Sequence, residues 1–141
     1  MGQIGSRLLK VKIGATDLTL QCSKLEIQAV DVDGPVTFSE AAAGGAKMWK
    51  LVGTAIQDTA SGSIWRTVWA SAGSTVAVVV NPFGVATFVA GSEGYSGNCV
   101  VAQPDGAFIG GEADPSVSMR RTFDFEWTFT AKPTELASGT F

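Results

Sequence analysis

Asp124 and Glu126 are two carboxylates whose spacing in this 141-residue chain permits chemistry. They alternate with bulky aromatic residues in the segment 121–130, so both fall on one face of an extended strand. Two neighbouring carboxylates can serve as general acid and base, as they do in glycosidases. Solvated carboxylates on the polar face of a strand are ordinary, however, so the pattern favours a polar wall over a catalytic pair.

Other catalytic and metal-binding patterns are missing from the sequence. The chain has no histidine, which removes the commonest general base and the commonest metal ligand. Asp31 and Asp33 could contact Ca²⁺, but the further oxygen ligands of an EF-hand loop are absent. Gly110-Gly111 does not lie between a strand and a helix, so it does not predict a phosphate-binding loop. We therefore expect no enzymatic activity, no cofactor and no metal site.

The cysteine content and the charge argue against further classes of site. Cys22 and Cys99 are too few for a disulfide scaffold or a zinc site, and we expect both to be small buried residues of strands. A Cys22–Cys99 disulfide is the alternative. The net charge is −3, and Arg120-Arg121 is the only adjacent basic pair, which argues against tight binding of phosphate groups.

Apolar runs in the sequence are short. None approaches the roughly 20 residues that a membrane-spanning helix needs, and the N-terminal residues do not form an apolar signal segment. The longest run, 76–80, has the length of a strand. The sequence therefore predicts a soluble protein that is made in the cytoplasm and does not span a membrane.

Period-two alternation predicts a mainly β domain spanning residues 1–141, a sandwich or barrel of about seven or eight strands with one flanking helix. Within 25–33 the apolar register slips between Ala29 and Val30, which predicts a bulge or a change of buried face. The helix is expected at 61–73, with Ser61 or Ser63 as N-cap and Gly73 as its stop. Strands are expected at 8–13, 18–22, 25–33, 47–57, 74–81, 95–103 and 122–130, with 86–90 either a short strand or irregular.

Aromatic residues from the helix and the last strand predict the core. Trp65 and Trp69 are four residues apart and share one helical face; a contact between subunits is the alternative for this pair. The aromatic face of the last strand must also be dry. The predicted core residues are Trp65, Trp69, Phe123, Phe125, Trp127 and Phe129.

Residues 33–47 predict a long hairpin loop built largely from small residues. Loops of this length in compact domains are usually functional or disordered. Val36 and Phe38 are its only large apolar residues up to Ala46. An aromatic side chain on such a tip has no role unless it meets another surface.

The order of these signals resembles the tail tube (major tail) proteins of long-tailed, non-contractile bacteriophages. The resemblance covers 49–133, while the N-terminal third fits only in outline. It rests on a strand ending at Gln57-Asp58, a helix with Ile64-Trp65-Arg66 and Trp69, the strand 76–80 followed by Asn81-Pro82, Ile109-Gly110-Gly111-Glu112-Ala113, and the strand 122–130 followed by Lys132-Pro133-Thr134.

The resemblance implies a structural virion protein. Six copies would join their inner sheets into a ring, and rings would stack into the tail tube that conducts DNA during ejection. The implied partners are further copies of the chain and tail proteins such as the tape measure and tail terminator, with DNA passing through without specific binding. The implied place is the virion tail, after assembly in the host cytoplasm.

Three alternatives remain open at this point. One is the tube protein of a contractile tail or of a type VI-like system. A second is a β-sandwich module for virion decoration or adhesion, and a third is a small hydrolase that uses carboxylates. Low charge, the small-residue tip and the family signals favour the tube.

Two sets of residues are candidates for contacts in such a tube. The candidates for contacts between rings are Val36, Phe38, Glu40, Leu136 and Phe141. The polar-face candidates, for either the lumen or the solvent, are Glu26, Gln28, Asp124 and Glu126. A neutral or acidic lumen would repel phosphate and let DNA slide.

Overall fold

The computed structural model describes residues 3–5, 7–32, 34–45, 47–118 and 120–141. It confirms the predicted class: eight antiparallel strands form a β-sandwich, and α2 is the one described helix longer than five residues. The strands are β1 (Lys10–Ile13), β2 (Thr16–Asp17), β3 (Cys22–Asp31), β4 (Lys47–Ile56), β5 (Thr75–Asn81), β6 (Gly94–Val100), β7 (Thr122–Phe129) and β8 (Thr134–Leu136), and the helices are η1 (Thr19–Gln21), α1 (Phe38–Ala42) and α2 (Ile64–Ser71).

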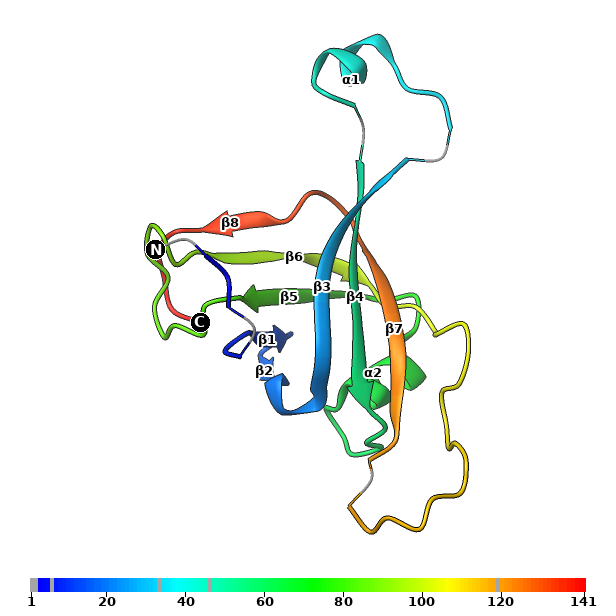
Figure 1. Ribbon diagram of the computed structural model, residues 1–141. Helices are drawn as coiled ribbons and strands as arrows, with labels where there is room; N and C mark the ends of the chain where they lie inside the picture. The colour runs from blue at the N-terminus through cyan, green and yellow to red at the C-terminus, as the bar shows by residue number, and fades with distance from the viewer. Residues whose placement is uncertain (1–2, 6, 33, 46, 119) are drawn as a thin grey trace.

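The strands form two groups that cross one another (Figure 1). β3, β4 and β7 run side by side, and β1, β5 and β6 lie across them in the order β2-β1-β5-β6-β7-β4-β3. The groups are joined by β6 and β7 at only two residue pairs, Cys99 with Phe129 and Val100 with Thr128. The short junction lets the sheet bend sharply, so its two halves pack face to face as the layers of a sandwich.

The aromatic face of β7 lies in the core, as predicted. Phe123, Phe125, Trp127 and Phe129 are each at most 5% exposed, whereas the alternating residues Asp124 and Glu126 are exposed. Leu51 and Ala55 of β4 and Val78 and Val80 of β5 fill the space between the layers. A period-two sequence thus builds a strand with one dry face and one wet face.

Helix α2 begins where one of the two predicted caps places it. The Ser63 hydroxyl accepts a hydrogen bond from the Arg66 backbone N–H at 3.1 Å, which satisfies one of the free donors of the first turn. The helix ends before Gly73, whose φ of +92° suits glycine. Ile64, Trp65 and Val68 are buried against the sandwich.

The prediction that Trp69 belongs to the core is wrong, because this side chain is 53% exposed. Phe108, from the loop after β6, lies 5.0 Å from Trp65 and 5.3 Å from Phe123 between ring centroids. Since Phe108 fills the space beside Trp65, Trp69 stacks on the outside of Trp65 at 5.4 Å. Its indole is therefore partly covered by aromatic neighbours but not enclosed.

One predicted strand is absent from the described structure, and a second segment follows the irregular alternative. Residues 18–22 do not alternate as a strand but contain η1, because the Asp17 carboxylate accepts hydrogen bonds from the Thr19 backbone and hydroxyl and forms a local turn. Within 86–90 the described residues form isolated bridges only, which matches the irregular alternative. Beyond the predicted strands, Thr134–Leu136 pairs with β6 as β8.

The predicted bulge between Ala29 and Val30 is absent, but the alternative, a change of buried face, is confirmed: the less exposed side chains are Leu25 and Ile27 on one face of β3 and then Gln28 and Val30 on the other. The β3–β4 ladder is continuous from Lys24 opposite Thr54 to Asp31 opposite Lys47, and its one shift lies between Cys22 and Lys24. Pairing between β4 and β7 begins only at Lys50. The ends of β3 and β4 therefore run past the sandwich, where neither face of the strand has to be apolar.

Both cysteines are free thiols, so the alternative of a Cys22–Cys99 disulfide is wrong. Cys99 is buried in β6, as expected, whereas Cys22 at the start of β3 is only half-buried. Burial disfavours the charged thiolate and raises the pKa of Cys22 to about 11 and that of Cys99 to about 12. None of the described helices has the length and apolar character needed to cross a bilayer.

The close packing of β4 predicts that a side chain at Gly53 destabilises the protein. A Cβ placed there would lie 2.6 Å from the Lys24 carbonyl oxygen and 2.8 Å from Cζ of Phe125. We expect Gly53→Ala to destabilise the protein by about 1–3 kcal/mol, since the strand backbone has to shift. Denaturant-induced unfolding measures this loss. Gly5→Ala is the control, because nothing lies within 4 Å of its Cβ; equal unfolding midpoints for the two variants would contradict the packing.

The raised thiol pKa values predict slow cysteine chemistry. Thiol reagents attack the thiolate, and a pKa of about 11 for Cys22 lowers its thiolate fraction at pH 8 on the order of 100-fold relative to a pKa of about 9. We expect native protein to react with a chromogenic disulfide reagent at least that much more slowly than protein in guanidinium chloride. Rapid modification of one thiol in the native state would show that Cys22 is more accessible than the structure indicates.

Candidate functional surface: a polar sheet face and a projecting arm

The outer face of β3, β4 and β7 carries all four predicted polar-face residues. The strand register aligns Glu26, Val52 and Glu126 in one row across the sheet. In the two neighbouring rows, Lys24 with Thr54 and Asp124 and Gln28 with Lys50 and Thr128, the side chains also point away from the core. We call this surface the polar face; it consists of Lys24, Glu26, Gln28, Lys50, Val52, Thr54, Asp124, Glu126 and Thr128.

Each carboxylate of the polar face has a partner. The Thr54 hydroxyl donates to Asp124 Oδ1 at 2.7 Å, and Lys50 Nζ donates to Glu126 Oε1 at 3.1 Å. Lys24 Nζ lies 3.3 Å from Glu26 Oε1. These exposed pairs contribute only about 0–1 kcal/mol each. They leave a surface with one more carboxylate than ammonium groups, and they place Asp124 and Glu126 in separate hydrogen-bonded pairs.

A hollow of about 480 Å³ borders the polar face where residues 102–105 pass beside it. It is lined by Lys24, Thr54, Asp124 and Glu126, and Asp105 adds a further carboxylate. Within the described part of the chain, no group of three or more Cys, Asp or Glu side chains is placed to hold a metal ion. Asp31 pairs with Lys47, while Asp33 lies outside the described residues.

The ends of β3 and β4 carry a projecting segment, residues 34–45, which we call the arm (Figure 1). The sequence predicted a long loop here, and the structure corrects this, because the arm contains the short helix α1. Thr37 and Glu40 form a capping box: the Glu40 N–H donates to Thr37 Oγ1 at 3.2 Å, and the Thr37 N–H donates to Glu40 Oε1 at 3.3 Å. Ala46, at the end of the predicted loop, lies outside the described residues.

The arm presents its apolar side chains to the solvent. Phe38 is 97% exposed and Val36 is about half-exposed, whereas the capping box leaves Glu40 half-buried. At the base of the arm, the Lys47 ammonium pairs with the Asp31 carboxylate. The hydrogen bond from Lys47 and its positive charge hold the pKa of Asp31 below its usual value.

The other two predicted contact residues lie away from the arm (Figure 1). Leu136 is half-buried in β8, opposite Gly94 of β6. The Phe141 ring packs edge-on against Phe88 at 6.3 Å, and Lys12 Nζ lies 4.7 Å from its centroid. Phe141 therefore has partners within the chain, Leu136 is half-covered, and the structure does not bring either together with Val36 and Phe38.

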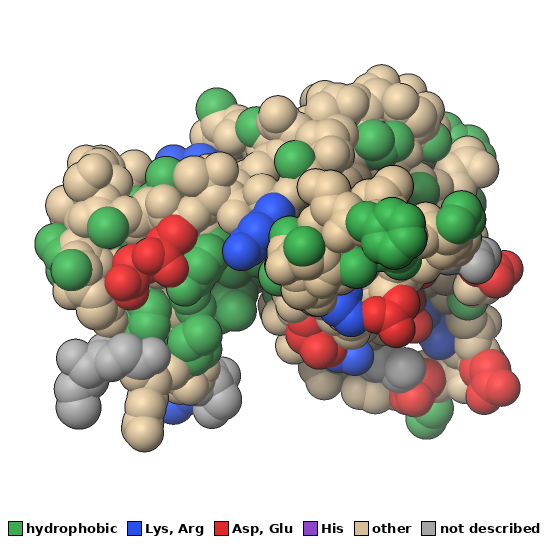
Figure 2. All heavy atoms as spheres, turned by 90° about the horizontal axis from the view of Figure 1, so that it is seen from above, with side chains coloured by type: hydrophobic (Ala, Val, Ile, Leu, Met, Phe, Trp, Pro, Cys, Tyr) green, Lys and Arg blue, Asp and Glu red, His purple; other side chains and the backbone are tan. Residues whose placement is uncertain are grey.

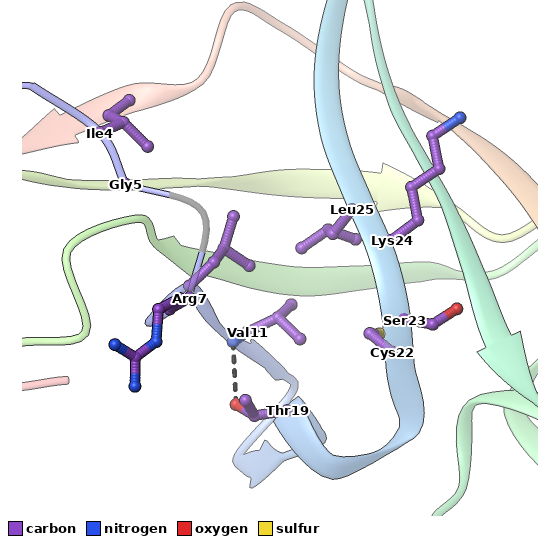
Figure 3. A pocket seen from close by; sticks show the side chains of 10 residues that line it. Ile4, Gly5, Arg7, Val11, Thr19, Cys22, Ser23, Lys24 and Leu25 are labelled. Atoms are coloured by element: carbon purple, nitrogen blue, oxygen red, sulfur yellow. Dashed lines mark hydrogen bonds between the residues drawn. The ribbon is translucent and has the colours of Figure 1, made fainter.

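The structure also reveals an opening that the sequence did not indicate. Among the described strands β3 pairs only with β4, so its other edge is unpaired and faces the N-terminal segment and β1. Figure 3 shows Leu25 and Val11 pointing into this gap and Lys24 pointing away from it. The cavity there measures about 450 Å³. Leu25 and Val11 occupy alternating apolar positions, so their sequence pattern is that of ordinary core residues.

A second cavity of about 470 Å³ adjoins the first through Ile4, Leu9 and Leu25. We call it the groove. Seen from above, hydrophobic side chains line a hollow between two lobes of the molecule (Figure 2). The groove is lined mainly by apolar side chains, with Glu26, Tyr95 and Lys132 as its polar members; the apolar lining is Ile4, Leu9, Leu25, Ile27, Trp49, Val80, Pro82 and Pro133.

No protein-family model and no curated protein sequence matches this chain. The polar face, the arm, the groove and the unpaired edge of β3 are the surfaces from which a function can be inferred.

The capping box predicts how the arm is held in shape. Thr37→Ala removes the hydroxyl that accepts the Glu40 N–H, so we expect α1 to lose about 1 kcal/mol of local stability. Amide hydrogen exchange at Ala41, Ala43 and Gly44, whose N–H groups donate within the arm, should quicken while the global unfolding midpoint stays constant. Thr37→Ser keeps the hydroxyl and should exchange like the unaltered protein. Unchanged exchange in Thr37→Ala would rule out the capping role.

Proposed function

We propose that this chain is the structural subunit of a tube, a tail tube protein of a long-tailed phage whose copies form rings that stack around a channel for DNA. The observation that carries the proposal is the unpaired edge of β3. This strand has ten residues, compared with a usual five or six. Its unpaired N–H and C=O groups form a template for pairing with another chain, and a closed ring would cover them.

The edge and the arm lie in two different directions, as a tube requires. A strand pairs sideways, through its edge, whereas the arm continues β3 and β4 lengthwise beyond the sandwich (Figure 1). Edge pairing between copies would close a ring, and arms reaching the next ring would build an open stack. Both are head-to-tail contacts, which give rings when the rotation closes and filaments when it does not.

The polar face lies at right angles to both contacts, so in a tube it faces either the channel or the outside. We assign it to the channel. Its hydroxyls and paired charges include one carboxylate in excess, which repels phosphate groups. The half-exposed Trp69 lies on α2, stacked on Trp65 and away from the polar face, and it suits a buried or outer position better than a channel through which DNA slides. The same geometry also fits the tube of a contractile tail or of a type VI-like system.

Electron microscopy and sedimentation of the concentrated protein test the proposal. We expect rings or stacked tubes with a channel wide enough for a DNA duplex. Protein that remains monomeric at every concentration and ionic strength would contradict it. Asp124→Asn with Glu126→Gln should assemble normally, because neither side chain has to act as an acid or a base in a tube.

Two variants separate the lateral contact from the axial one. Ala29→Lys places a charge on the exposed end of β3, on the same face as Leu25, and should prevent ring formation without affecting the monomer. Replacing residues 34–45 by an Asn-Gly turn should leave rings but abolish stacking. Ala60→Lys, at another exposed alanine, is the control. Normal stacking without the arm would overturn its axial role.

A further inference from the structure

We propose that Phe38 on the arm of one copy inserts into the groove of a second copy. This inference rests on the proposed tube and identifies the surface that would receive the arm. Phe38 begins α1 and is 97% exposed, which is unusual for a large aromatic side chain. Val36 lies two residues earlier and is about half-exposed. We call these two exposed apolar side chains of the arm the knob.

The groove has the size and lining to accept such a knob. Its volume of about 470 Å³ falls within the range of sites that enclose small aromatic ligands. Trp49 and Tyr95 provide aromatic walls, and Pro82 and Pro133 provide rigid apolar ones. In a monomer Trp49, Tyr95 and Pro133 remain partly exposed to water, as Phe38 is fully, so burying the knob in the groove removes apolar area from both.

The knob cannot reach the groove of its own chain. Leu25, Ile27 and Trp49 of the groove belong to the same β3–β4 ladder that carries the arm. That ladder stays paired up to Asp31 opposite Lys47, where the side chains also form an ion pair. The arm therefore continues away from the groove, as Figure 1 shows, and a second copy must supply the occupant.

Charges favour the same pairing. Glu40, two residues from Phe38, is the one charged residue of the arm. Lys132 lies in the groove lining, with its Nζ 5.9 Å from the Trp49 ring centroid. The carboxylate of Glu26, also in the lining, is already 3.3 Å from Lys24 Nζ. Glu40 of the arm and Lys132 of the groove therefore carry opposite charges. Attraction between them would fix the orientation of the arm in the groove more than it would raise the affinity.

Photo-crosslinking locates the contact directly. Benzoylphenylalanine replaces Phe38, and ¹⁵N-labelled and unlabelled chains are mixed before assembly, so that mass spectrometry distinguishes crosslinks between copies from those within one. We expect crosslinks between copies to peptides that contain Leu25 and Ile27, or Lys132 and Pro133. Benzoylphenylalanine at Trp69, another exposed aromatic position, should not label these peptides. Crosslinks within one copy, or to another surface of the second copy, would overturn the inference.

Substitutions on each side of the contact provide an independent test. Phe38→Ala removes the knob, and Ile4→Glu puts a charge into the groove at a side chain that is 60% exposed, so the fold should tolerate it. We expect each to raise the protein concentration needed for stacking at least tenfold, as seen by sedimentation, with unchanged circular dichroism. Leu20→Ala, at a residue that is 92% exposed outside the groove, is the matched control and should stack normally.

The outcomes also separate this inference from the proposed function. If the unaltered protein stacks and Phe38→Ala and Ile4→Glu stack equally well, the tube stands and the knob-and-groove contact is wrong. If the unaltered protein never assembles, both are overturned. Loss of stacking in these two variants with retention of single rings supports both.

Discussion

The burial of one aromatic row between two sheet layers is the interaction on which the rest of this structure depends. Phe123, Phe125 and Trp127 pack in succession along β7, with centroid distances of 6.2 and 5.1 Å. Because a strand alternates, burying this row turns Asp124 and Glu126 outward. Pairing of β7 with β4, and of β4 with β3, then extends the same division across three strands. A one-residue slip would place the aromatic residues in water, so the register is strongly determined.

The same register generates the exposed surfaces on which the proposed assembly depends. β3 and β4 are longer than their overlap with β7, so their ends leave the sandwich and carry the arm. β3 is also last in the sheet order, so its outer edge stays unpaired among the described strands. A sheet that bends without closing therefore has an edge, a groove beside that edge and an arm at its end. These three features give the proposed subunit its directions of contact.

Local sequence patterns correctly predicted the elements that depend on interactions between near neighbours in the chain. Ser63 caps α2 because its hydroxyl can reach the Arg66 N–H, and the alternation at 122–130 gave the correct faces of β7. One failure had a non-local cause, and the other was a local signal that was overlooked. Trp69 was placed in the core because helical spacing does not show that Phe108, about forty residues away, occupies the space beside Trp65. Helix α1 was missed because its five residues are too few to show a helical hydrophobic period, although the Thr37–Glu40 spacing is that of a capping box.

The sequence by itself determined the β class, the position of α2 and which residues of β7 face the core, because these follow from hydrophobic periodicity and capping between near neighbours. It also identified Glu26, Gln28, Asp124 and Glu126 as polar strand positions. Only the tertiary structure decided that these four share one face, since that depends on the register of strands about 100 residues apart. It likewise decided that the sheet leaves β3 unpaired beside an apolar groove. Leu25 and Ile27 have the pattern of core residues, and whether a facing layer covers them depends on how far the sheet closes.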